Sequence, residues 1–239
     1  MRLELARARD IGALFRDSFA VYARHARVFI PLSAAVVVPV FLAVEGVGLE
    51  KLTADYDDSP TLAEAAVPTV ITFLVVTPIV TAICIHALRS VAAGERVGAG
   101  RAFVSGFEAF TPLFFAVLLA ALGIAVGFLL LVVPGVYLAV RWFFVPQTVV
   151  IDAARGPDAL TRSSEVVRGF WWRTFGLVVL INLAVTIPAF VLSAPFTAIA
   201  TSTDEAVWAL IGSIVAESVT APFAALFSTL LYYDLKARR

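Results

Sequence analysis

The sequence has few charged residues and one cysteine, and each shortage excludes a class of protein. Charged residues make up 15% of the 239 residues, whereas soluble domains average roughly 25%. The chain therefore cannot cover a water-soluble globule of its size. Cys84 is the only thiol, so neither a disulfide nor a cysteine-based metal site forms within one chain. The formal net charge is zero, which argues against broad nucleic-acid binding.

Motifs of common enzyme classes are also missing. The sequence contains no phosphate-cradling loop of the Walker kind, no His-Glu-x-x-His helix and no Gly-x-Ser-x-Gly elbow. The two histidines, His25 and His86, stand apart from acidic or histidine partners, which makes each a poor metal ligand. We therefore expect a non-enzymatic protein without a metal or a cofactor.

Long hydrophobic runs are abundant. Hydrophobic residues make up 61% of the chain, the mean hydropathy is +0.94, and a membrane span needs about 20 such residues. We predict one integral membrane domain over residues 1–239, an all-α polytopic transmembrane helical bundle. Its six expected spans are residues 28–49, 66–88, 112–133, 136–151, 174–198 and 206–233.

The third and fourth spans lie in one nearly unbroken apolar segment, residues 113–151. A continuous helix there would reach roughly 58 Å, about twice the hydrocarbon core. Pro134-Gly135 sits near the middle, and this dipeptide is a turn signal. We predict two spans joined by a tight hairpin at these two residues.

Positive charge predicts the orientation. The segments 1–27, 89–111, 152–173 and 234–239 hold 16 of the 18 lysine and arginine residues, whereas the 50–65 segment is acidic. Positive charge on short loops marks the cytoplasmic side, so we expect both termini on the cytoplasmic side of a plasma membrane. Rings beside charges predict interfacial anchors at Trp171, Trp172, Arg173, Tyr232 and Tyr233.

An amphipathic segment precedes the first span. Ile11, Leu14, Phe15, Phe19, Tyr22 and Ala26 share one face of a helix over residues 10–27, and four charged residues share the other. Such a helix suits the headgroup region. A similar pattern precedes the third and fifth spans, so we predict a threefold repeat of an interfacial helix and a helical hairpin.

Three polar residues fall inside the expected spans: Arg141, Asn182 and Glu217. Such groups are costly in hydrocarbon and usually face the protein interior. We consider three interpretations of this candidate intramembrane cluster. It forms a substrate or proton site, or an ion pair that fixes helix packing, or Arg141 extends outward and never meets Glu217.

Three stretches together carry a family resemblance. They are PGVYLAVRWFFVPQTVVID from Pro134, GPDALTRSSEVVRGFWWRTFGLVVL from Gly156, and the C-terminal LLYYDLKARR. With the six-span layout, they resemble the membrane domain associated with some glycerophosphoryl diester phosphodiesterases, which also occurs alone in bacterial membrane proteins. Asp152 matches the acidic residue that this family has at the end of the fourth span, and residues 159–163 match its Ala-Leu-x-Arg-Ser helix start. The resemblance implies no catalytic residues, because the phosphodiesterase activity lies in a separate soluble barrel.

Two functions follow as hypotheses. The first is a bacterial membrane scaffold or accessory protein in envelope or lipid-related processes, whose basic helices hold anionic lipids on the cytoplasmic side. This hypothesis leaves room for a protein partner in the membrane, but not for nucleic acid. The alternative is a transporter or channel with Arg141, Asn182 and Glu217 lining a polar path.

Overall fold

The computed structural model describes residues 4–5, 7–46, 69–95, 98–203 and 205–239. The acidic 50–65 segment of the sequence lies outside these residues. Within them the regular secondary structure is entirely helical, as the hydrophobic runs predict. Six helical segments are long and apolar enough to cross a membrane: Ile11–Val44, Thr69–Ala93, Phe110–Leu130, Val132–Asp152, Trp171–Thr203 and Val207–Ala237.

The first amphipathic segment and the first span form one kinked helix, α1 (Ile11–Phe41). The Asp10 side chain caps it by accepting a hydrogen bond from the Ala13 amide. The backbone leaves helical geometry at His25, close to the boundary that the sequence predicts. A π-helical turn, η1 (Leu42–Gly46), follows α1. The second span consists of a similar turn, η2 (Thr72–Val76), and α4 (Thr77–Ala93).

Short amphipathic helices also precede the third and fifth spans, in the predicted order. They are α5 (Ala99–Glu108) and α9 (Pro157–Val167). Helix α5 leads into α6 (Phe110–Leu130), and α9 leads into α10 (Trp171–Thr203), which pairs with α11 (Ala206–Ala237). The unit of a short helix and a hairpin therefore recurs along the chain at the level of secondary structure.

The third and fourth spans form the expected hairpin, but its turn lies before the predicted Pro134-Gly135. The chain reverses at Leu131, which has extended backbone angles, and α7 (Val132–Arg141) begins at the next residue. Pro134 lies in the first turn of α7, where a missing N–H costs nothing. Gly135 instead allows close packing on α6, because a Cβ on Gly135 would lie only 2.5 Å from the Phe128 ring.

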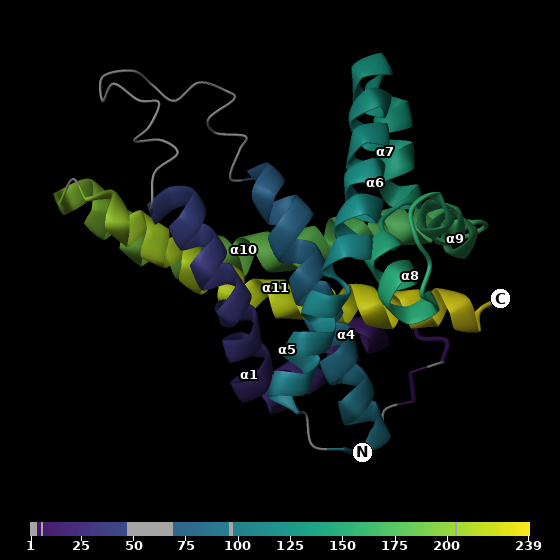
Figure 1. The fold of residues 1–239 in the computed structure, drawn as a ribbon, viewed down its shortest axis with the longest axis horizontal. Coiled ribbons are helices and arrows are strands. Elements are labelled where there is room, and N and C mark those ends of the chain that lie inside the picture. Colours follow the sequence, from purple (N-terminus) through teal and green to yellow (C-terminus); the bar gives the residue numbers. More distant parts are fainter. Residues whose placement is uncertain (1–3, 6, 47–68, 96–97, 204) are drawn as a thin grey trace.

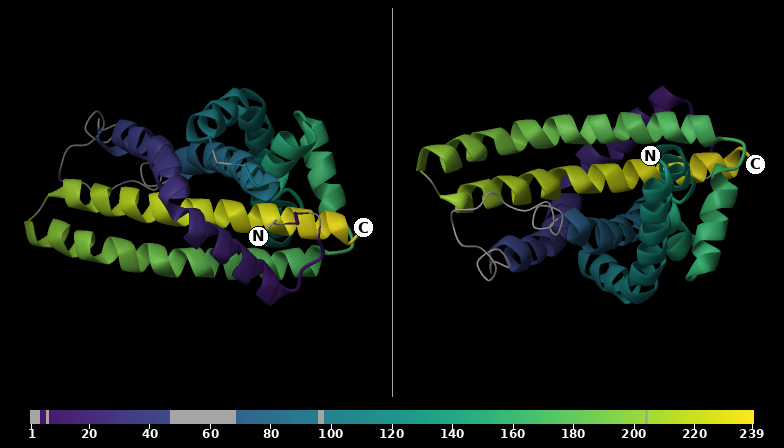
Figure 2. Two further views of the ribbon diagram at one scale, coloured as in Figure 1. Left: turned by 90° about the horizontal axis from the view of Figure 1, so that it is seen from below. Right: turned by 90° about the horizontal axis from the view of Figure 1, so that it is seen from above.

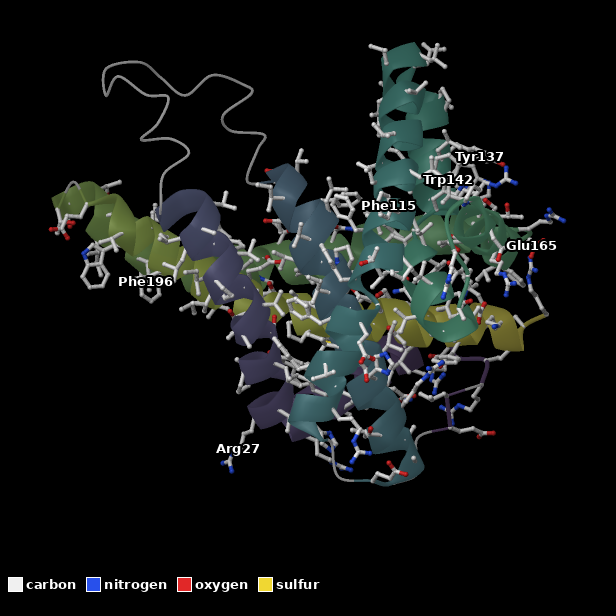
Figure 3. All side chains as sticks on the ribbon, in the orientation of Figure 1. Arg27, Phe115, Tyr137, Trp142, Glu165 and Phe196 are labelled. Carbon is white, nitrogen blue, oxygen red and sulfur yellow. The ribbon has the colours of Figure 1, made fainter. Side chains whose placement is uncertain are left out.

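The fourth span is broken rather than continuous. Helix α7 ends at Arg141, and α8 (Val145–Asp152) starts after a turn over residues 142–144. Pro146 lies in the first turn of α8. The Trp142 ring packs over Gly123 of α6, where a Cβ would lie 2.4 Å from the ring (Figure 3). Glycine therefore allows the close helix contact at this point.

The hairpins do not share one direction. Helices α10 and α11 lie side by side and antiparallel, and α1 crosses α11 (Figure 2). The α6–α7 hairpin runs across the direction of α10 and α11 (Figure 1). The largest apolar core lies where α1, α4 and α11 meet, with Phe29, Ile83 and Phe227 fully enclosed. Much of the remaining apolar surface faces outward, as a protein surrounded by lipid requires.

Candidate functional site

A buried carboxylate, Asp234, is the centre of the most extensive polar contact in the described structure. Its side chain has no exposed area, although it lies near the end of α11. It accepts hydrogen bonds from the Arg9 backbone N–H at 2.6 Å, from Arg173 Nη2 at 3.1 Å and from Arg238 Nε at 2.9 Å. Two of these donors are cationic, so the negative charge of Asp234 is fully compensated.

Arg9 extends this network toward α1. Its guanidinium is buried, with Nε 3.1 Å from Asp17 Oδ2 and Nη1 3.0 Å from the Leu5 carbonyl oxygen. The carbonyl of Arg9 in turn accepts hydrogen bonds from Arg173 Nη2 at 2.8 Å and from Arg238 Nη2. We call Arg9, Asp17, Arg173, Asp234 and Arg238 the Asp234 network. It ties the segment before α1 to the start of α10 and the end of α11.

A second carboxylate, Asp152, joins the end of α8 to α11. It accepts hydrogen bonds from the Tyr232 hydroxyl at 2.5 Å and from Lys236 Nζ at 2.9 Å. Tyr232 is fully buried and packs on Phe144, with ring centroids 5.6 Å apart. The acidic residue highlighted by the family resemblance therefore has a helix-joining contact in this chain.

Ser163 of α9 closes the break in the fourth span. Its Oγ accepts a hydrogen bond from the Phe144 backbone N–H at 3.2 Å and donates one to the Arg141 carbonyl at 2.9 Å. Nearby, Thr148 Oγ1 contacts the Ala159 carbonyl oxygen at 3.1 Å. A broken helix frees backbone groups that must find partners in a non-aqueous setting. The side chain of Ser163 satisfies two of them.

The three residues of the candidate intramembrane cluster have separate partners. Arg141 Nη1 donates to the Tyr137 hydroxyl at 3.2 Å, and Asn182 Nδ2 donates to the Val178 carbonyl of its own helix at 2.7 Å. Glu217 is half-buried on α11. No hydrogen bond or ion pair among the described residues joins Glu217 to Arg141 or Asn182.

The predicted interfacial anchors have different environments. The Trp171 ring stacks on Tyr137 and Phe175, whereas Trp172 is 76% exposed. Arg173 belongs to the Asp234 network, and Tyr232 is enclosed. Tyr233 is half-buried and its hydroxyl lies 3.5 Å from Arg89 Nε. Their role as interfacial anchors stays a prediction.

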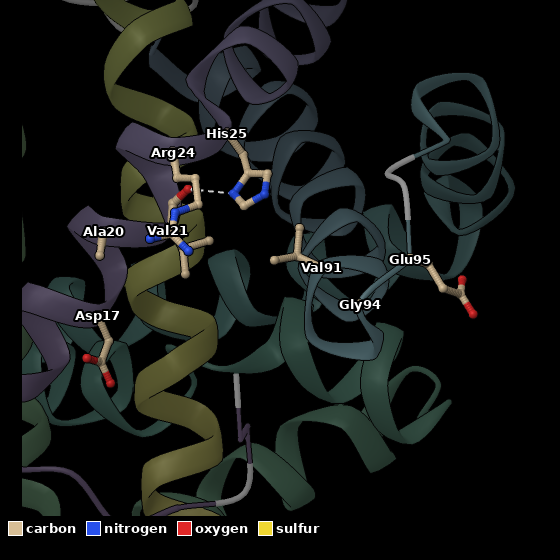
Figure 4. A pocket seen from close by; sticks show the side chains of 8 residues that line it. All are labelled: Asp17, Ala20, Val21, Arg24, His25, Val91, Gly94 and Glu95. Atoms are coloured by element: carbon tan, nitrogen blue, oxygen red, sulfur yellow. Dashed lines mark hydrogen bonds between the residues drawn. The ribbon is translucent and has the colours of Figure 1, made fainter. Parts of the chain in front are cut away.

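Two hollows open near the charged ends of the helices. The first has a volume of about 220 Å³ and lies between α1 and the end of α4 (Figure 4); its lining is Asp17, Ala20, Val21, Arg24, His25, Val91, Gly94 and Glu95. The second, about 500 Å³, lies between α9 and the end of α11; its lining is Asp152, Asp158, Thr161, Arg162, Glu165, Val166, Lys236 and Arg239. Neither hollow is lined by Arg141, Asn182 or Glu217. Among the residues that the structure describes, no three His, Cys, Asp or Glu side chains are placed to hold a metal ion.

These features define a multi-span, all-helical membrane protein. The chain belongs to a family described as a domain of unknown function, DUF7847, which matches residues 29–235. No curated protein and no solved structure matches the chain.

Proposed function

We propose that this protein is a non-enzymatic accessory or scaffold protein of a bacterial inner membrane, which holds anionic lipid headgroups on its cytoplasmic face. In this proposal both ends of the chain lie on the cytoplasmic side. The observation that carries it is the distribution of charge on the first half of α1. Asp17, its buried acidic residue, binds Arg9, whereas Arg16, Arg24 and Arg27 are exposed.

The three arginines present a basic face next to the membrane. At 100° per residue, Arg16 and Arg24 lie about 80° apart around the part of α1 before the kink, and Arg27 follows the departure from helical geometry at His25. Figure 3 shows Arg27 extending away from α1. The opposite face packs on α11, where the rings of Phe15 and Phe227 have centroids 4.6 Å apart. Because this packing already fixes α1, binding a headgroup costs no further backbone conformational entropy in the helix.

The resemblance to the membrane domain of glycerophosphoryl diester phosphodiesterases is part of this proposal. It is supported by Asp152 and Ser163, which match the resemblance and make contacts between helices. Both residues act on packing, which suits a domain that positions something else in the membrane. A protein partner in the membrane remains part of the proposal on the same grounds.

The transport alternative receives less support from the geometry. A transport site would need polar groups that converge in the middle of the membrane. Arg141 and Asn182 instead each bond a neighbour on their own helix. The described hollows open among charged residues near helix ends. The polar residues of this protein thus favour joining helices over forming a path.

The proposal predicts a preference for anionic lipid that depends on the three arginines. We expect phosphatidylglycerol to raise the unfolding midpoint of the full-length protein in detergent more than phosphatidylcholine does. Each arginine near an anionic surface contributes about 1 kcal/mol, so replacing all three with glutamine should weaken phosphatidylglycerol binding by up to about 100-fold. Native mass spectrometry of the protein with bound lipid measures this change.

The matched control replaces the same three arginines with lysine, which keeps the charge and should keep most of the preference. High salt should reduce binding by the original protein, because exposed charges are screened. Equal binding of phosphatidylglycerol and phosphatidylcholine by the original protein would contradict the proposal.

A further inference from the structure

We infer that the α6–α7 hairpin does not cross the bilayer, and that its exposed tip lies in the hydrocarbon of a single leaflet, where acyl chains surround it. In the proposed orientation this leaflet is the cytoplasmic one. Only this assignment of the leaflet rests on the proposed function. The helices are long enough to cross a membrane, but the contacts of α7 place the tip at a shallower depth.

The tip is apolar throughout and exposed. Residues 112–136 contain no side chain that forms hydrogen bonds. The five residues around the turn are 66% to 87% exposed: Leu129, Leu130, Leu131, Val132 and Val133. By contrast, the tip of the α10–α11 hairpin carries Thr201, Ser202 and Thr203. A continuous exposed apolar surface of this kind is stable in hydrocarbon and unfavourable in water.

The depth of the tip follows from a contact between α7 and α10. The Tyr137 and Trp171 rings stack with centroids 5.9 Å apart, and Trp171 Nε1 donates to the Tyr137 carbonyl at 3.4 Å. Leu131 lies six residues before Tyr137, a helical rise of about 9 Å. Because the hairpin runs across α10 rather than along it (Figure 1), this rise plus the length of the Trp171 side chain is an upper limit on the depth of the tip below Trp171. That limit is well short of the ~30 Å hydrocarbon core.

Trp171 itself lies at the membrane surface. It is the first residue of α10 and precedes Arg173 by two positions, and Arg173 binds the buried Asp234 together with Arg9 and Arg238. A cluster of five charged residues belongs at the headgroup level rather than in hydrocarbon. Because α10 has 33 residues, it rises about 50 Å and reaches the other surface, whereas the α6–α7 hairpin runs across it (Figure 1).

Backbone groups of the turn form hydrogen bonds with neighbouring backbone groups rather than with water. The Leu131 N–H donates to the Gly127 carbonyl at 3.0 Å, and the Gly135 N–H donates to the Leu131 carbonyl at 3.3 Å. Non-helical backbone at membrane depth is tolerated only where its polar groups have such partners. At the end of α7, Arg141 donates to the Tyr137 hydroxyl, and the Tyr137 ring stacks on Trp171. This polar and aromatic group marks the point where the hairpin enters the interface.

Single-cysteine labelling of the full-length protein in cells and inverted membrane vesicles tests this inference. Cys84 is free and buried, so the unmodified protein is the background control. The variants are Leu131→Cys at the hairpin tip, Ser202→Cys at the α10–α11 tip and Arg168→Cys near the start of α10. A membrane-impermeant maleimide should label Ser202→Cys in spheroplasts and Arg168→Cys in inverted vesicles. Leu131→Cys should react at less than a tenth of those rates from either side.

A second measurement separates burial in lipid from burial in protein. A bimane fluorophore on Leu131→Cys, in reconstituted vesicles, should be quenched more by a nitroxide on the lipid acyl chain than by one on the headgroup. Labelling of Leu131→Cys in spheroplasts at the rate of Ser202→Cys would overturn the inference, and so would protection without acyl-chain quenching. Labelling of Ser202→Cys only in inverted vesicles would instead overturn the proposed orientation and leave the hairpin inference supported.

Discussion

Replacing Asp234 with alanine should destabilise the protein by about 3–5 kcal/mol, the usual cost of removing one partner from a buried ion pair. The carboxylate is fully buried and binds Arg173 and Arg238 as well as the Arg9 backbone. Without it, the Arg173 and Arg238 guanidinium groups lose their carboxylate partner, and the Arg9 backbone N–H loses its acceptor. Unfolding of the purified protein by sodium dodecyl sulfate, followed by circular dichroism, measures the loss.

The matched control is Asp158→Ala. Asp158 also pairs with an arginine, Arg162, at 2.9 Å, but both side chains are about half exposed. An exposed pair of this kind contributes about 1 kcal/mol or less. Asp234→Asn, which keeps the shape and one acceptor oxygen, should fall between the two. Equal effects of Asp234→Ala and Asp158→Ala would contradict the role assigned to the Asp234 network.

The second large effect is expected from Ser163→Ala. The variant leaves the Phe144 N–H and the Arg141 carbonyl without their side-chain partner at the break in the fourth span. An unsatisfied buried polar group costs about 1–3 kcal/mol, and water does not reach the fully buried Ser163 to replace its hydroxyl. The same unfolding assay should show a loss of at least about 2 kcal/mol from two such groups.

Thr161→Ala on the same helix is the control for Ser163→Ala. Thr161 is exposed and its hydroxyl donates only to the Pro157 carbonyl, one turn earlier in α9. Its removal should change stability by less than about 0.5 kcal/mol. If Ser163→Ala is as mild as Thr161→Ala, then Ser163 does not hold the broken helix together.

The sequence predicts the helical class and the order of the elements because hydrophobic length and charge placement are local properties. Residues 10–27 and the run after them predict an amphipathic helix and a span, and α1 contains both, with a kink at His25. The Pro134-Gly135 signal predicts a turn in the right region but at the wrong residues. The signal fails there because proline fits the first turn of a helix as well as a turn, and because Gly135 is needed for contact with α6.

The Asp234 network could not be predicted from the sequence. Asp234 meets Arg9 across 225 residues of chain, and nothing local indicates that pairing. Ser163 could be recognised in a motif, but its role depends on the break after Arg141, which no residue pattern marks clearly. A local signal for the hairpin contact is present in the sequence: Gly123 and Gly127 are spaced four apart, the pattern of close helix packing. Gly127 packs against Gly135 of α7, and Gly123 packs against Trp142 directly after α7.

The network and the splayed hairpins together suggest how such a protein works in a membrane. The Asp234 network joins the segment before α1 to α10 and α11, and Ser163 joins α9 to the break between α7 and α8. The apolar hairpins extend in different directions (Figures 1 and 2). In the proposed function, the charged end binds headgroups or a partner, and the apolar hairpins contact acyl chains.

We propose that the chain spans the membrane with the Asp234 network on the cytoplasmic side. Protease digestion of short epitope tags appended at each end of the chain, in spheroplasts and in inverted vesicles, tests it most directly. The account predicts that both tags resist protease in intact spheroplasts and are removed in inverted vesicles. Removal of either tag in intact spheroplasts would contradict it.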